Sequence, residues 1–171
     1  MKQMMNKYVG IALVTFAGVF TLSSCDKDDD HITVNPPQEV MQVFAAQYPD
    51  VNPRWDFEWG NYEAEFFYSG THGEWNMPMN NVETEAFYTA GGKWIRTTFD
   101  VTNYYYVSED QVVIPAVVRQ TIQQYAAGGK HVDDVKIYDM PQGETDYYRV
   151  EIDNEPNDIY VSIQFDGTLL P

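Results

Sequence analysis

The stretch WDFEWGNYEAEFFY, residues 55–68, decides the fold class because its apolar residues occupy alternate positions on both sides of a turn. Trp55, Phe57 and Trp59 alternate with acidic residues, and Gly60-Asn61 provides the turn. Beyond the turn the apolar positions are Tyr62, Ala64, Phe66 and Tyr68. Strict alternation is typical of strands with one buried face, and two such runs around a short turn predict a β-hairpin.

Around this hairpin, residues 36–103 read as one helix followed by four antiparallel strands. Pro36-Pro37 opens a helical pattern that Pro49 ends, and its apolar face comprises Val40, Val43, Phe44 and Tyr48. After a loop over residues 69–81, alternation returns over 82–88 and, past Ala90-Gly91-Gly92, over 93–99. The pattern predicts an α+β unit whose helix packs on one face of its sheet.

A second copy of this order is predicted over residues 104–171. Ile114-Pro115 opens a helix with Val118, Ile122 and Tyr125 on one face, and Gly128-Gly129 ends it. Strands are expected over residues 132–140, 148–152 and 159–165, and a short fourth strand over 168–171 after the Asp166-Gly167 turn. The mature chain is therefore interpreted as a tandem repeat of helix plus four-stranded sheet.

The order of these elements resembles the PepSY-like, beta-lactamase-inhibitor-like domains of Bacteroides-type lipoproteins. The residues that carry the resemblance are Pro37, Val40, Phe44, Tyr48-Pro49, Trp55, Tyr62, Phe66, Tyr88 and Trp94, then Ile114-Pro115, Val118, Ile122, Tyr125, Tyr148, Val150, Phe165-Asp166-Gly167 and Leu169. The second unit departs from the pattern because Ala126-Ala127-Gly128-Gly129 replaces Tyr-Pro after its helix. The resemblance implies tandem units with an open sheet face opposite the helices, and it implies protein binding by analogy.

Aromatic and acidic residues share the nominally polar side of the predicted strands. The acidic residues are Glu63, Glu65, Glu83 and Glu85, and the aromatic ones are Phe67, Phe87, Tyr147 and Tyr160. Trp75, in the loop between two strands, is expected to add to them. Apolar rings among charges on an outer strand face are typical of a protein-binding surface. The alternatives are a slip of one residue in the strand faces, which would bury the rings, a plain solvated acidic face, and a basic partner or Ca²⁺ patch.

Catalytic motifs are absent from the sequence. His31, His72 and His131 lack metal-ligand spacing and are expected to be exposed, and neither a nucleophile elbow nor a phosphate-binding glycine loop occurs. We therefore expect a non-enzymatic protein with no cofactor and no metal. The alternative is a carbohydrate-active or other secreted enzyme that uses surface carboxylates.

The first 24 residues resemble a bacterial lipoprotein signal peptide. Lys2 and Lys7 precede an apolar stretch over residues 9–20, and Leu22-Ser23-Ser24 precedes the single cysteine, Cys25. We expect Cys25 to carry lipid and residues 25–35, which are rich in aspartate, to form an acidic tether. An uncleaved membrane anchor is the alternative. The signal predicts a cell-envelope location, at the outer membrane on its periplasmic side or at the cell surface.

Charge excludes one class of partner. Two of the ten basic residues lie in the signal segment, so eight remain against 26 acidic residues, a balance of −18. Such a surface repels nucleic acid and anionic lipid headgroups. The expected partners are an envelope protein or peptide, and the membrane only through lipid on Cys25.

Overall fold

A computed structural model describes residues 34–107 and 112–171, which lie in one compact unit. The predicted signal peptide, the lipidation site Cys25, His31 and nearly all of the acidic tether lie outside the described residues. Within them, no helix has the length and apolar character needed to cross a membrane.

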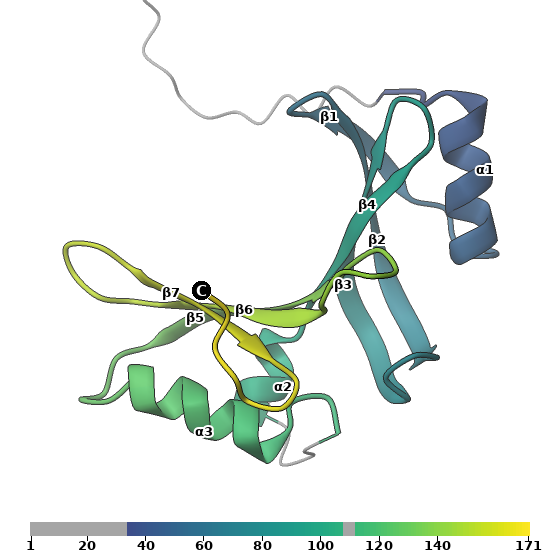
Figure 1. Ribbon diagram of the computed structural model, residues 1–171. Helices are drawn as coiled ribbons and strands as arrows, with labels where there is room; N and C mark the ends of the chain where they lie inside the picture. The colour runs from purple at the N-terminus through teal and green to yellow at the C-terminus, as the bar shows by residue number, and fades with distance from the viewer. Residues whose placement is uncertain (1–33, 108–111) are drawn as a thin grey trace, which may run out of the picture. The chain divides into compact units, whose positions relative to one another are not determined.

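The described chain forms a single antiparallel sheet of seven strands in sequence order (Figure 1). The elements are α1 (Gln38–Gln47), β1 (Arg54–Glu58), β2 (Asn61–His72), β3 (Met77–Thr89), β4 (Trp94–Asp100), α2 (Thr102–Val107), α3 (Ala116–Tyr125), β5 (Val132–Asp139), β6 (Tyr147–Ile152) and β7 (Ile159–Gln164). The α+β class and the order of helix before strands are confirmed.

Prolines and glycines bound the two main helices where the sequence predicts. Pro37 and Pro115 are the N-cap residues of α1 and α3, where a missing backbone N–H carries no cost. Gly128 and Gly129, just beyond α3, have φ angles of +87° and +85° that other residues rarely adopt. The helix boundaries therefore follow from local backbone chemistry.

Three details of the predicted repeat are wrong. The units do not form separate four-stranded sheets, because β4 pairs with β5, with Thr97 opposite Asp139 and Phe99 opposite Ile137. The predicted fourth strand over 168–171 is reduced to an isolated bridge between Leu169 and Ile163. The predicted loop over 69–81 is largely strand, because β2 and β3 continue to His72 and Met77.

Both hydrophobic clusters lie on the same face of the sheet. Under α1, Val40 and Phe44 pack on Ala64 and Ala86, and Figure 1 shows this helix beside the β1–β4 part of the sheet. Under α3, Ile122 and its neighbours pack in a larger cluster with Phe99, Ile137, Tyr148 and Ile163, which are aligned across four strands. The end of the β2–β3 hairpin joins this larger cluster through Met77 and Met79. The opposite face is left without a helix among the described residues.

Candidate functional site

The open sheet face is built by the residues that alternate with the core positions. The strand register places Glu65 opposite Glu85, Glu85 opposite Thr98, Thr98 opposite Tyr138, and Tyr138 opposite Tyr147. Successive side chains point to opposite faces of a strand, so this row crosses the face from β2 to β6. Pairing of β4 with β5 thus joins the predicted acidic and aromatic positions of both units into one surface.

The four predicted glutamates lie on the part of this face formed by β2 and β3, but their surroundings differ. Glu65 accepts hydrogen bonds from Arg54 on β1, and Glu85 accepts one from the hydroxyl of Thr98. Glu83 is exposed. The alternative of a plain solvated acidic face therefore does not describe Glu65 and Glu85, which are partly buried.

Glu63 is the clearest exception, because it is only 7% exposed. Burial raises the pKa of its carboxyl to about 7, and the negative charges of Glu85, Glu58, Glu65 and Asp56 add to the rise. Both effects disfavour the charged form. Glu63 is a carboxyl that takes up or releases a proton near neutral pH.

Arg96 is stacked on aromatic rings near the middle of the open face. Its guanidinium carbon lies 4.0 Å from the centre of the Phe87 ring and 5.7 Å from that of Tyr138. Tyr138 stacks in turn on Tyr147, with ring centres 4.9 Å apart and planes inclined by 18°. The Nε of Arg96 is buried and has no hydrogen-bond partner among the described residues. Stacked rings hold this cation in place without neutralising it.

A second stacked arginine lies on β6. The guanidinium of Arg149 lies 5.1 Å from the centre of the Tyr160 ring and donates a hydrogen bond to Ser162. The Tyr160 hydroxyl donates to Glu151, and the ring remains 53% exposed. The Tyr160 ring and Phe67, which is 62% exposed on β2, both present apolar surface to solvent.

The structure therefore places Phe67, Phe87, Tyr147 and Tyr160 on the open face, and the alternative, a slip of one residue that would bury these rings, does not occur. Several hollows interrupt this face. One of about 460 Å³ is lined by Arg54, Glu65, Phe67 and Glu83 among others, and one of about 330 Å³ by residues that include Lys136, Arg149 and Tyr160. Hollows and projecting aromatic rings of this kind can fit against the surface of a partner protein.

Trp75 does not share this face, so its inclusion in the predicted surface is wrong. Its ring contacts Phe99 and Phe165 on the helix side of the sheet, and its indole N–H donates to Asp146 at 2.8 Å. The end of the β2–β3 hairpin packs on the larger core. The Gly- and Met-rich sequence of this segment is typical of a loop and did not predict this packing.

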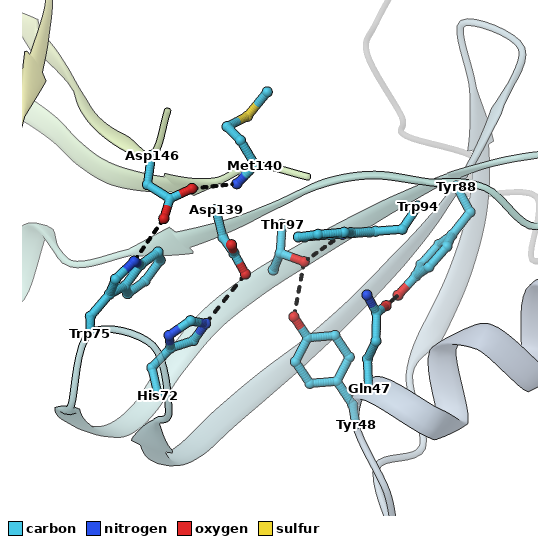
Figure 2. Close-up of polar contacts among 10 residues, drawn as sticks. All are labelled: Gln47, Tyr48, His72, Trp75, Tyr88, Trp94, Thr97, Asp139, Met140 and Asp146. Atoms are coloured by element: carbon cyan, nitrogen blue, oxygen red, sulfur yellow. Dashed lines mark hydrogen bonds and ion pairs between the residues drawn. The ribbon is translucent and has the colours of Figure 1, made fainter. Parts of the chain in front are cut away.

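A cleft on this helix side was also missed by the sequence reasoning. It measures about 570 Å³ and lies between the end of α1, the end of the β2–β3 hairpin and the connection from β5 to β6. His72, expected to be exposed, lies in it with Nε2 at 3.3 Å from Asp139 (Figure 2). Asp146 accepts hydrogen bonds from Trp75 and from the backbone N–H of Met140.

Arg96, Tyr138 and Arg149 on the open face were likewise not singled out from the sequence. Arg96, like Thr98, alternates with core residues of β4. This alternation is the sequence signal that could have identified Arg96 as an open-face residue. Alternation shows that a residue lies on a given face of the sheet, but it does not show which strand is the neighbour. The stack of Arg96 on Phe87 and Tyr138 depends on strand order, which one sequence does not reveal.

Comparison with known proteins supports the fold. No protein-family model matches the sequence, and no curated protein matches it either. A BLIP-like protein from Bacteroides fragilis is 19% identical, with 84% of this chain and 89% of that chain covered and a TM-score of 0.62. A DUF2874 family protein from Bacteroides ovatus is 18% identical, with 81% and 86% covered and a TM-score of 0.62.

A third solved structure, of a protein from Bacteroides eggerthii proposed to be periplasmic, is 18% identical over 81% of this chain and 88% of that chain, with a TM-score of 0.60. At such low identities the likeness concerns the fold alone. The chain has a BLIP-like fold, an open antiparallel sheet with few helices.

Proposed function

We propose that this chain is an exported, lipid-anchored, non-enzymatic module that binds a protein or peptide of the cell envelope through its open sheet face. The observation that carries the proposal is a face spanning seven strands, uncovered by any described helix, on which arginine and aromatic side chains are already packed together. Tyrosine, phenylalanine and arginine are the side chains in which protein interfaces are enriched.

Preorganisation gives the face its binding capacity. Arg96 is held between two rings before any partner arrives, so little side-chain entropy is lost when it binds. A guanidinium offers five donors in a fixed plane, and residues of this type dominate interface energies when they are surrounded by apolar contacts. Phe67 and Tyr160 supply exposed apolar area on either side.

The envelope location rests on the amino-terminal sequence and on the resemblance. Lipid on Cys25 and an acidic tether over residues 25–35 would hold the folded unit near a membrane. The BLIP-like and periplasmic descriptions of the similar Bacteroides structures are consistent with a PepSY-like lipoprotein whose two units, 36–103 and 104–171, form one binding surface. The surface charge makes an anionic nucleic acid an unsuitable partner.

An enzyme that uses surface carboxylates is the second candidate, and the geometry favours it less. Glycoside hydrolysis requires one carboxylic acid and one carboxylate that flank a cleft. On the open face Glu63 has a pKa raised toward that of a general acid, but its carboxyl is buried and does not flank a cleft. Glu65 and Glu85 are engaged by Arg54 and Thr98.

Capture from the native envelope tests the proposal. The chain with a tag in place of the lipid is expected to recover the same partner as a Met41→Ala control, which removes an exposed apolar side chain from α1. Phe67→Ala and Tyr160→Ala are each expected to reduce recovery at least fivefold. Equal recovery by all four proteins, at equal folded concentration, would show that the partner does not use this face.

A further inference from the structure

The helix-side cleft has the chemistry of a site for organic cations. None of its lining residues is a lysine or an arginine, whereas four are acidic: Glu74, Asp139, Glu144 and Asp146. Its volume of about 570 Å³ falls within the range of small-molecule sites, roughly 300–1,000 Å³. This cleft is separate from the open face, because it lies on the opposite side of the sheet, between the end of α1, the end of the β2–β3 hairpin and the connection from β5 to β6.

Three carboxylates meet at one point of the cleft. Glu74, Asp139 and Asp146 each offer an oxygen, and these oxygens lie within 4.8 Å of one another. An atom at the centre of such a triangle is about 2.8 Å from each oxygen, which is the length of a charge-assisted N–H···O hydrogen bond. A primary ammonium has three donors, one for each carboxylate.

A histidine lies beside this carboxylate cluster and is packed against a tryptophan. His72 stacks on Trp75 with ring centres 3.9 Å apart, and its buried Nδ1 has no hydrogen-bond partner among the described residues. A proton on Nδ1 would be a buried donor without an acceptor, which is costly. Nε2 of the same ring lies 3.3 Å from Asp139, which is 6% exposed (Figure 2).

Aromatic rings line another part of the cleft. Tyr48, Tyr68 and Trp94 belong to its wall, and Tyr48 and Trp94 are fixed by hydrogen bonds to the hydroxyl of Thr97 at 2.9 and 3.1 Å. Figure 2 shows Tyr48, Trp94 and Thr97 beside Asp139 and His72. Such rings accommodate both an aliphatic chain and the positive charge at its end.

We propose that the cleft binds a primary amine on an aliphatic chain, with the ammonium held by Glu74, Asp139 and Asp146 and the chain lying against Tyr48, Tyr68 and Trp94. A calcium ion fits the site less well, because Ca²⁺ takes about 6–8 oxygen ligands, whereas three side chains converge here. The aromatic wall also has no role in holding a bare ion.

Calorimetric titration of residues 31–171, the compact unit, with n-pentylamine tests the proposal. One amine is expected to bind per chain, while 1-pentanol, pentanoate and CaCl₂ give no saturable heat. Asp139→Asn is expected to weaken pentylamine binding about tenfold or more, because a charged hydrogen bond is lost at a buried position. Glu74→Gln, at an exposed position where the fold does not depend on it, should weaken binding about threefold.

Glu39→Gln is the matched control, since it makes the same change of charge on the exposed first turn of α1, outside the cleft. Near-UV circular dichroism verifies that each variant is folded. If Asp139→Asn does not fold, the amine affinity of Glu74→Gln provides the test. The proposal is overturned if pentanol binds as tightly as the amine, if CaCl₂ binds and the amine does not, or if Glu74→Gln leaves the affinity unchanged.

Discussion

At Glu63, burial and like charge act in the same direction on a single proton. The carboxyl is shielded from solvent on the open face and is surrounded by other acidic groups, which together raise its pKa from 4.5 to about 7. The folded protein therefore holds this proton at pH values where the unfolded chain has released it. Whether Glu63 is charged at neutral pH thus depends on the fold. This residue lies in the acidic half of the proposed binding face.

Stability should decline with rising pH because of this group. Its contribution is fully present below pH 4.5, the unfolded pKa, and is lost as the pH rises through about 7. Glu63→Gln removes the titration and is expected to raise the free energy of unfolding at pH 8 by about 1–2 kcal/mol, after allowance for solvent screening. Urea denaturation at pH 5 and pH 8 measures both effects.

Glu83→Gln is the matched control, since Glu83 is exposed on the same face. It should leave the difference in stability between the two pH values as it is in the unchanged protein. If Glu63→Gln retained the full pH dependence, another group would be responsible for it.

Among the elements, one glycine turn in each half of the sheet contacts the helix of the same half. Gly92, in the turn between β3 and β4, has φ +78°, and a Cβ there would lie 3.2 Å from the backbone of Glu39 on α1. Gly167, beyond β7, has φ +88°, and its Cβ would lie 3.3 Å from Val117 on α3. Glu39 and Val117 are both the second residue of their helix. Each helix is thus fixed by close contact with a glycine turn.

Gly92→Ala is expected to lower the free energy of unfolding by about 1–3 kcal/mol, because it forces a Cβ into both a left-handed conformation and the backbone of α1. Thermal unfolding followed by circular dichroism measures the loss. Gly91→Ala, one residue earlier, meets only Thr89 Oγ1 at 4.0 Å and should change stability little. Equal effects of the two substitutions would show that the contact with Glu39 does not constrain the turn.

Much of each element could be predicted from the sequence, because the signals are local. The alternation in residues 55–68 predicts β1 and β2, and Pro37 and Pro115 mark the helix starts. The end of the β2–β3 hairpin could not be predicted in this way. Met77 and Met79 alternate as strand residues do, but Gly73 and Pro78 around them favour a loop. Their burial depends on a core formed mainly by β5–β7 and α3.

At the scale of the whole molecule, the pairing of β4 with β5 determines which residues of the two halves lie side by side on the open face. It aligns Thr98 with Tyr138 and thereby brings Arg96 of one half next to Tyr138 and Tyr147 of the other. The sequence predicts two sheets with exposed aromatics but carries no local signal for this pairing, because register between distant strands depends on the packing of both halves. The two proposed sites, the open face and the helix-side cleft, both depend on this pairing.

Site-specific photocrosslinking in the native envelope tests most directly whether the open face binds an envelope protein. A photoreactive phenylalanine analogue would replace Phe67, Tyr160 or, as a control on α1, Met41. We predict adducts with one and the same envelope protein from positions 67 and 160 and none from position 41. An adduct from position 41 with none from the two positions on the open face would contradict the proposed function.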